Sequence, residues 1–235
     1  MITLSKTQLD ELKRRCWSYS QLSRFKQCPY SYWRRYVKGD KYPSPNTSLG
    51  LALHDYAEKL ANHDRVDPMH CFRAAGVYPR QKPEFDRGVD SLNAFVPAQV
   101  HPYRRLTEHK QYYYVGPFEF IIICDVILFI KDKVWVWDYK ASSSADYADS
   151  HQFQFSIYQH FLETSYPDKN IKTQLYFPIP NKSVPLQHKP FTADELGAMV
   201  ENVLGCQDFK PTPHKWCRTC EYQKRGCPFH EKKSL

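Results

Sequence analysis

The sequence lacks an apolar segment long enough to cross a membrane or to form the core of an export signal. Its first sixteen residues, MITLSKTQLDELKRRC, are mostly polar. The longest apolar run, residues 118–130, is interrupted by Glu119 and Asp125. A membrane-spanning helix needs about 20 consecutive apolar residues. We therefore expect no membrane association and a cytoplasmic location.

The sequence also lacks internal repeats and low-complexity linkers, so it does not resemble a repeat array or a disordered chain. It has 235 residues, of which 42% are hydrophobic, enough for a domain with a buried core. We expect one domain over residues 1–235. Within it, residues 1–47 and 206–235 should form one subregion and residues 48–205 the main core.

Acidic residues are fewer than basic ones. The chain has 33 Lys and Arg against 25 Asp and Glu, a formal net charge of +8 with neutral histidines. This excess favours a polyanionic partner over an acidic protein surface. The alternative is a basic surface that only keeps the protein in solution.

The pattern of apolar residues predicts an α/β domain with a central mixed sheet flanked by helices. We expect helices over residues 20–27, 31–37, 48–63, 151–163 and 192–205, and strands over residues 111–115, 118–130, 134–140 and 172–178. Ser48 is the expected N-cap of one helix, and Thr192 with Glu195 forms a capping box for another. Residues 39–46 and 141–150 read as loops, and residues 64–110 as further helices.

The strand at residues 134–140 carries an acid and a lysine on one face. Side chains alternate along a strand, so Asp138 and Lys140 share one face while Trp135, Trp137 and Tyr139 share the other. A hairpin turn near residue 132 would place Asp125 opposite residue 138 or 139. Two adjacent carboxylates need a cation, and hard oxygen ligands suit Mg²⁺ or Mn²⁺.

Such a site has the groups that phosphodiester cleavage needs, with a cation to neutralise charge and Lys140 to orient or deprotonate a water. The alternative is a surface hairpin with solvated side chains. Against it, Asp125 lies within the apolar run FIIICDVILF, where an unpaired carboxylate would be costly.

The order of these residues resembles the RecB-like branch of the PD-(D/E)xK nuclease superfamily. The resemblance is carried by GLALH ending at His54, by Asp125, by Asp138-Tyr139-Lys140 and by QFSIY from Gln154 to Tyr158. It implies a restriction-endonuclease-like core and a metal bound by His54, Asp125, Asp138 and the Tyr139 carbonyl. It further implies that Lys140 is catalytic and that Gln154 and Tyr158 lie beside the site and position DNA.

Helical spacing independently places Gln154 and Tyr158 on one face of a helix that follows the Asp138 strand. A Gln and Tyr at this spacing are more often a polar surface pair, and a single histidine such as His54 is more often structural than a ligand.

Eight cysteines in a chain without an export signal favour metal binding over disulfides. Cys217, Cys220 and Cys227 lie close together in the tail, and Cys28 could supply a fourth thiol, with Cys16 as a rival. Cys71, Cys124 and Cys206 have no partners by spacing and are expected to be buried apolar residues.

One early and three late cysteines resemble the iron–sulfur subgroup of this nuclease family. Examples are the AddB-type helicase–nucleases and the CRISPR-associated nucleases of the fourth Cas family. The resemblance implies a [4Fe–4S] cluster that joins the two ends of the chain. Zinc is the alternative, with His214 or His230 completing the site.

The segment before residue 37 interleaves cations with aromatic rings. Arg24, Tyr30, Arg34 and Arg35 belong to this segment, which is suited to phosphates and unpaired bases. Packing of Trp33 and Tyr30 around the cluster is an equally good interpretation.

Together these features predict a metal-dependent DNA nuclease, an exonuclease on single strands or DNA ends, in recombination, repair, phage replication or CRISPR adaptation. No G-x-x-x-x-G-K-[ST] motif is present, so unwinding would need a helicase partner, and a recombination or integration partner is also expected. The alternative is a non-catalytic, metal-stapled DNA-binding module.

Overall fold

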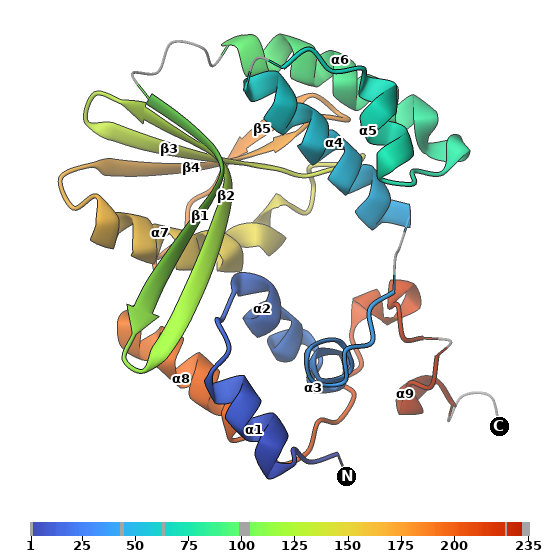
Figure 1. The fold of residues 1–235 in the computed structure, drawn as a ribbon, viewed down its shortest axis with the longest axis vertical. Helices are drawn as coiled ribbons and strands as arrows, with labels where there is room; N and C mark the ends of the chain where they lie inside the picture. Colours follow the sequence, from blue (N-terminus) through green and yellow to red (C-terminus); the bar gives the residue numbers. More distant parts are fainter. Residues whose placement is uncertain (1, 43–44, 63, 99–103, 224, 232–235) are drawn as a thin grey trace. The chain divides into compact units, whose positions relative to one another are not determined.

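The computed structural model describes residues 2–42, 45–62, 64–98, 104–223 and 225–231 (Figure 1). The chain forms two compact units. The first comprises Met1–Tyr42, Tyr112–Ile121 and Thr192–Leu235, and the second comprises Pro43–Gln111 and Ile122–Phe191. In the described part of the chain, no helix combines the length and apolar character that crossing a membrane would require.

A five-stranded mixed sheet with the order β1-β2-β3-β4-β5 organises the chain. The strands are β1 (Arg104–Val115), β2 (Phe118–Ile130), β3 (Lys133–Tyr139), β4 (Asn170–Phe177) and β5 (Lys182–Pro185). β2 pairs with β3 in the antiparallel sense, β3 with β4 in the parallel sense, and β4 with β5 in the antiparallel sense. The predicted α/β class with a mixed central sheet is confirmed.

Two tight connections set the positions of the long strands. β1 and β2 are joined by Gly116 and Pro117, and Gly116 has a φ of 56°, which glycine adopts without a steric cost. β2 turns into β3 at Lys131 and Asp132, and the register pairs Val126 with Trp137. Continued by one residue, this register places Asp125 opposite Asp138, as the sequence predicted.

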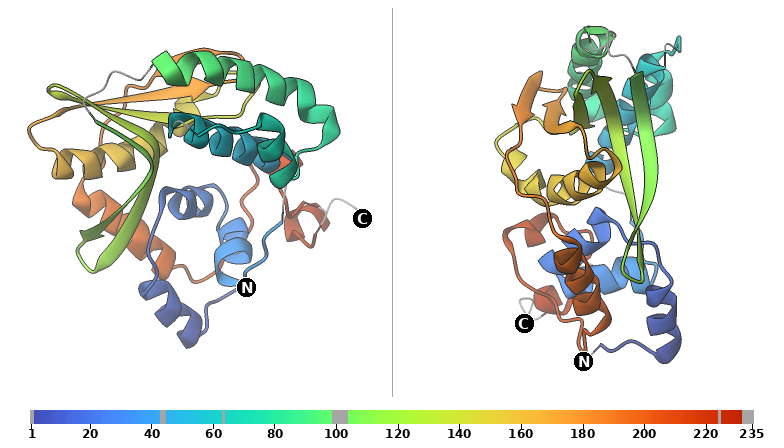
Figure 2. Two further views of the ribbon diagram at one scale, coloured as in Figure 1. Left: turned by 45° about the horizontal axis from the view of Figure 1, so that its top comes forward. Right: turned by 90° about the vertical axis from the view of Figure 1, so that its left-hand side faces the viewer.

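Helices cover both faces of the sheet in the second unit. Parallel strands need a crossover connection, and α7 (Gln152–Ser165), preceded by the short η3 (Ala148–His151), supplies it between β3 and β4. α7 lies on one face, whereas α4 (Pro45–Ala61), α5 (Pro68–Ala74), η2 (Pro79–Gln81) and α6 (Lys82–Ala98) lie on the other (Figures 1 and 2).

Alternation along β3 decides which side chains meet which helices. Trp137 and Tyr139 join the buried cluster formed with α4, α5 and α6, and Trp135 packs against it. Leu53 of α4 is 1% exposed in this cluster. Val134, Val136 and Asp138 lie at alternate positions and therefore face α7. The predicted division of β3 into an aromatic face and an Asp138 face is confirmed.

The first unit joins the two ends of the chain. It contains α1 (Lys6–Lys13), α2 (Tyr19–Gln27), α3 (Pro29–Tyr32), the π-helix η1 (Trp33–Val37), α8 (Ala193–Leu204), η4 (Lys215–Thr219) and α9 (Pro228–Glu231). The Ile2 amide donates to Asp208 Oδ1 at 2.8 Å, and the Phe209 amide donates to the Ile2 carbonyl at 3.0 Å. The predicted Thr192 and Glu195 capping box begins α8.

Some local predictions were wrong. α4 begins at Pro45, so Ser48 lies inside the helix and is not its N-cap. Proline fits the first turn of a helix because an N–H group at that position would have no hydrogen-bond partner within the helix. The expected end near His63 lies outside the described residues, as do residues 43–44 of the expected loop at 39–46. Residues 104–110, expected to be helical, belong to β1. Pairing within the sheet overrides their weak β propensity.

α1 and β5 are among the elements that were not expected. α1 begins with a capping box in which Ser5 and Gln8 exchange hydrogen bonds. β5 is a four-residue strand at the edge of the sheet, and only its pairing with β4 distinguishes it from a loop.

Leu51 and Leu53 provide a matched test of this packing, because they lie on the same helix with opposite exposure. We expect Leu53→Ala to lower the free energy of unfolding by about 2 to 5 kcal/mol, since it leaves a cavity among α4, α6 and the sheet. Leu51 is 59% exposed, so Leu51→Ala should change it by less than about 0.5 kcal/mol. Urea unfolding followed by circular dichroism measures both, and equal losses would contradict the assigned packing.

Candidate metal centre and cysteine site

Two buried carboxylates lie side by side on β2 and β3. Asp125 is 9% exposed and Asp138 is 2% exposed. Asp125 Oδ2 accepts a hydrogen bond from the Tyr139 amide at 2.6 Å. Burial, with the neighbouring Asp138 carboxylate, raises the pKa of Asp125 to about 7, although His54 acts to lower it. Two ionised carboxylates in this buried site are therefore destabilising unless positive charge lies nearby.

Lys140 follows directly after β3 and forms an ion pair with Asp138 Oδ2. Its amide donates to the Tyr176 carbonyl of β4 at 2.9 Å, which fixes the backbone at this point. The Lys140 side chain remains 23% exposed. The ammonium group is thus held beside the buried acids and can be reached from solvent.

α7 places Gln154 and Tyr158 against the same carboxylates. Gln154 Nε2 donates to Asp138 Oδ1 at 2.6 Å and to the Tyr158 hydroxyl at 3.0 Å. The Tyr158 hydroxyl in turn donates to the Ile123 carbonyl of β2 at 2.6 Å. Both side chains are buried. The expectation that these two residues share one helical face beside the acids agrees with their positions.

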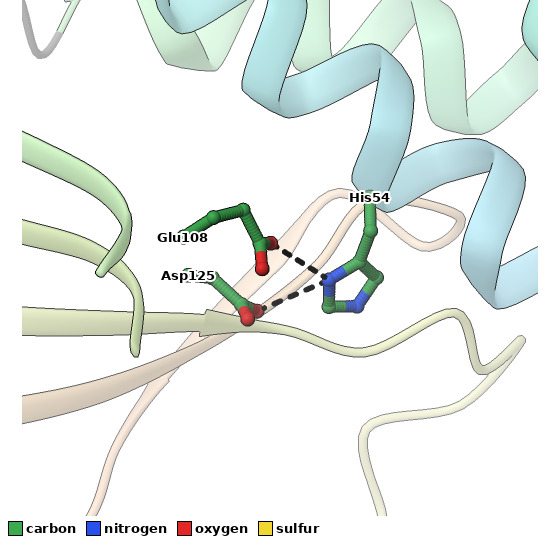
Figure 3. Close-up of side chains that lie close together, drawn as sticks. All are labelled: His54, Glu108 and Asp125. Carbon is green, nitrogen blue, oxygen red and sulfur yellow. Dashed lines mark ion pairs between the residues drawn. The ribbon is translucent and has the colours of Figure 1, made fainter. Parts of the chain in front are cut away.

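His54 of α4 reaches the carboxylates from the opposite helical layer (Figure 3). Its Nε2 lies 2.8 Å from the Tyr139 carbonyl oxygen, and its Nδ1 lies 3.4 Å from Asp125 Oδ2. A carbonyl oxygen can only accept a hydrogen bond, so Nε2 carries the proton in this contact. Burial lowers the pKa of His54, but Asp125, Glu108 and Asp138 outweigh burial and raise it overall to about 9.

Glu108 of β1 completes the group that Figure 3 shows, and the sequence analysis did not identify it. Its Oε1 lies 3.9 Å from His54 Nδ1. Its neighbours in sequence carry no motif, and residues 64–110 were expected to be helical. Only the pairing of β1 with β2 brings this carboxylate to the site, so no local sequence signal could have found it.

A second histidine lies near the lysine. Burial and the charge of Lys140 together lower the pKa of His151 on η3 to about 4, although Asp138 acts to raise it. His151 is therefore neutral at physiological pH.

The donor atoms around His54 fit a divalent cation. One ligand atom each from His54, Glu108 and Asp125 lies within 4.8 Å of the others, and a nitrogen with carboxylate oxygens suits Mn²⁺ and Mg²⁺. The Asp138 oxygens contact Gln154 and Lys140, and the Tyr139 carbonyl contacts His54. Of the four predicted ligands, His54 and Asp125 thus belong to this group, whereas Asp138 and the Tyr139 carbonyl adjoin it.

The four predicted cluster cysteines line one cavity in the first unit. Cys28, Cys217, Cys220 and Cys227 all border it, together with His214. Burial raises the pKa of the Cys220 thiol, and the nearby Cys227, Cys28 and Cys217 sulfurs raise it further, against the Tyr222 amide, which lowers it. Cys28 therefore joins the three tail cysteines, and the rival Cys16 is not among the residues that border this cavity.

Backbone amides point at two of these sulfurs. The Thr212 amide donates to Cys28 Sγ at 3.4 Å, and the His214 amide donates to Cys217 Sγ at 3.3 Å. Such bonds stabilise thiolates, the form in which cysteine binds a metal or a cluster. Among the remaining cysteines, Cys71 and Cys124 are fully buried as expected, whereas Cys206 is half-buried.

His214 borders the same cavity, so a site of cysteine and histidine ligands, which zinc favours, stays the alternative to an iron–sulfur cluster. The side chain of His230, one of the two alternative zinc ligands, lies outside the described residues.

The predicted nucleic-acid contacts of the N-terminal segment pack around this cysteine site. Arg34 is 7% exposed, donates to the Tyr30 hydroxyl at 3.0 Å and to the Arg225 carbonyl at 2.9 Å, and forms an ion pair with Asp40. Tyr30 is buried, and its hydroxyl donates to the Gly226 carbonyl at 2.6 Å. These two side chains hold the cysteine-bearing tail against α3.

Arg24 and Arg35 are more accessible than Arg34. Both contact Glu221, at 2.6 Å and 3.3 Å respectively, and their side chains are 29% and 30% exposed. A role in binding nucleic acid stays a prediction for all four residues.

Comparison with known proteins finds a family model that matches most of the chain. A model of the PD-(D/E)XK nuclease superfamily matches residues 16–228. The solved structure of a "Putative exonuclease" from Eubacterium rectale is similar with a TM-score of 0.52 and 10% identity, over 94% of this chain and 94% of that chain. The crystal structure of SSO0001 has a TM-score of 0.49 and 15% identity, over 95% and 93%. No curated protein matches the chain in sequence.

The match spans nearly the whole chain, and the mixed sheet flanked by helices is consistent with the restriction-endonuclease-like fold of that family. The chain therefore belongs to the PD-(D/E)XK nuclease superfamily.

Proposed function

We propose that the chain is a metal-dependent DNA nuclease of the RecB-like, iron–sulfur branch, which hydrolyses phosphodiester bonds and acts on single strands or free DNA ends. Residues 1–235 would work as one nuclease domain. The observation that carries the proposal is the buried pair Asp125 and Asp138 with Lys140 beside it. A structural hairpin has no need of two buried acids next to each other, because their mutual repulsion lowers stability.

Each group has a task in the proposed reaction. A bound divalent cation would supply charge neutralisation at the scissile phosphate and a lowered pKa for water. His54 and Asp125, with Asp138 and the Tyr139 carbonyl adjoining, would hold that cation. Lys140, fixed by Asp138, would orient the attacking water or stabilise negative charge on the phosphate.

Gln154 and Tyr158 would position Asp138 and, through it, Lys140. Their hydrogen bonds link α7 to Asp138 and to the backbone of β2, so Asp138 cannot rotate freely. A buried carboxylate held by a neutral donor keeps its second oxygen available for the lysine. From the same face, the amide and the phenol would help align the DNA backbone.

The cysteine site supports a [4Fe–4S] cluster. Four cysteines border one cavity, and the sulfurs of two of them accept amide hydrogen bonds. The cluster would join α3 to the C-terminal tail. Zinc remains the alternative ligand to test against.

The substrate and the partners follow from charge and from the family. The net charge of +8 suits a polyanion, and Arg24 and Arg35 could extend a basic surface near the cysteines. The Eubacterium rectale neighbour carries an exonuclease name, which agrees with action at DNA ends. A helicase or a recombination or integration complex would supply such ends in repair, recombination, phage replication or CRISPR adaptation.

Lys140→Ala tests the catalytic role. We expect it to slow Mn²⁺-dependent cleavage of labelled single-stranded DNA by on the order of a hundredfold or more, because the charge beside the scissile phosphate is lost. DNA binding, measured by fluorescence anisotropy, should persist. Lys172→Ala is the matched control, since Lys172 is an exposed lysine on β4 of the same sheet and should leave the rate unchanged.

Cleavage by Lys140→Ala at the parent rate would contradict the mechanism. A parent protein that binds DNA but cuts neither single-stranded nor double-stranded substrates would favour the alternative, a metal-stapled DNA-binding module.

Protons should compete with the metal. Because burial and neighbouring carboxylates raise the pKa of Asp125, and carboxylates raise the pKa of His54 despite its burial, both groups retain protons to a higher pH than usual. Metal binding must displace these protons, so we expect Mn²⁺ affinity to rise from about pH 6 to about pH 8. Calorimetry in two buffers of different ionisation enthalpy measures the release, and a pH-independent affinity would contradict the expectation.

Cysteine substitutions test the cluster. Anaerobically purified protein should be brown and contain iron and sulfide, and Cys220→Ser should lose most of both, because a thiolate ligand is removed. Cys206→Ser is the matched control, since Cys206 does not border the cavity. A colourless parent protein with stoichiometric zinc would show that the site holds zinc.

A further inference from the structure

We propose that Glu108 of β1 is a ligand of the divalent cation bound by His54 and Asp125. The inference rests on the proposed metal-dependent function and adds a residue outside the D-x-K hairpin. The cation would be held by His54 Nδ1 and by the carboxylates of Asp125 and Glu108, whose ligand atoms lie within 4.8 Å of one another (Figure 3).

The hydrogen bonding of His54 decides which of its nitrogens faces a metal. Nε2 points at the Tyr139 carbonyl oxygen, 2.8 Å away, and must carry a proton there. The neutral ring then has its lone pair on Nδ1, which faces Asp125 and Glu108. Metal-binding histidines commonly donate their other N–H to a backbone carbonyl in this way, and the bond fixes the ring orientation.

The same contacts leave Glu108 as the third donor. The Tyr139 carbonyl already accepts from His54, and the Asp138 oxygens contact Gln154 and Lys140. The Glu108 carboxylate is 32% exposed and lies within ion-pair distance of His54. An ion pair with a 3.9 Å separation between a carboxylate oxygen and a histidine nitrogen contributes little to the stability of the fold. The contact with His54 therefore does not by itself explain why Glu108 lies here.

The backbone at Glu108 indicates a functional position. Its φ is 45°, in the left-handed region that residues other than glycine rarely adopt, and it lies within a strand. Such strained residues persist where the surrounding structure holds them in place, and they concentrate at ligand sites. Here the unusual φ accompanies a side chain that reaches His54 and Asp125.

The local charge also favours a cation. The carboxylates of Glu108, Asp125 and Asp138 all lie near His54, and Lys140 pairs with Asp138. Glu58 lies one turn beyond His54 on α4, and Glu108 is close enough to contribute to the raised pKa of Glu58, second to burial. A set of one imidazole and two carboxylates should bind Mn²⁺ more tightly than Mg²⁺, because nitrogen ligands suit the softer ion.

Direct metal titration of the full chain tests the assignment without measuring cleavage. Mn²⁺ binding is followed by calorimetry and by the electron paramagnetic resonance signal of free Mn²⁺. We expect Glu108→Gln to raise the Kd for Mn²⁺ by about tenfold or more, because a charged ligand becomes a neutral amide. Asp125→Asn should abolish measurable binding.

Glu58→Gln is the matched control, since it removes a neighbouring carboxylate that is not an assigned ligand. It should change the Kd by no more than about twofold. A loss equal to that of Glu108→Gln would show a general charge effect and overturn the ligand assignment.

A second variant keeps the test decisive if Glu108→Gln folds poorly. Glycine tolerates a φ of 45°, so Glu108→Gly should keep or raise the Tm of the metal-free protein while losing most of the Mn²⁺-induced rise in Tm. A Glu108→Gly protein that keeps the full Mn²⁺-induced rise would overturn the inference.

The outcomes separate the inference from the proposed function. Unchanged Mn²⁺ affinity in Glu108→Gln, with binding lost in Asp125→Asn, would reject Glu108 as a ligand and leave the metal-dependent nuclease intact. A parent protein that binds no Mn²⁺ would overturn both.

Discussion

The antiparallel pairing of β2 with β3 is the contact on which the candidate site depends. It pairs Val126 with Trp137 and so brings Asp125 opposite Asp138, with both carboxylates withdrawn from solvent. Side chains alternate along a strand, so a shift of one residue in this register would turn one acid away from the other. The burial of two like charges lowers stability locally, and the Tyr139 amide, Gln154 and Lys140 compensate through hydrogen bonds and charge.

Helices on both faces of the sheet add the remaining side chains of the candidate site to this pair of strands. α7, the crossover between parallel strands β3 and β4, delivers Gln154 and Tyr158 from one face. α4 delivers His54 from the other, where the aromatic side of β3 packs against α4 and α6. His54, Gln154 and Tyr158 are therefore held by helices that pack against the sheet, which limits the movement of these side chains.

The cysteine site has a different structural basis. Its four sulfurs come from opposite ends of the chain. The segment from α2 to η1 holds the tail through Arg24, Tyr30 and Arg34, of which Arg24 donates to Glu221 of the tail. Arginines and aromatic rings close together in sequence suggest a nucleic-acid surface. Here the guanidinium of Arg34 is buried and bonded to Tyr30 and to the tail backbone, so part of that segment serves packing.

The amino-acid sequence by itself determined the α/β class, the hairpin that brings Asp125 beside Asp138, the two faces of β3, the helical pairing of Gln154 with Tyr158 and the group of three cysteines in the tail, because each follows from strand or helix periodicity or from the close spacing of unusual residues. It did not determine that residues 104–110 form a strand, since RRLTEHK has no strong β propensity and pairs only because β2 lies beside it. For the same reason only the tertiary structure decided that Glu108 meets His54 and Asp125. The choice between Cys28 and Cys16 likewise required the folded chain, because two cysteines twelve residues apart become distinguishable only when one of them borders the cavity.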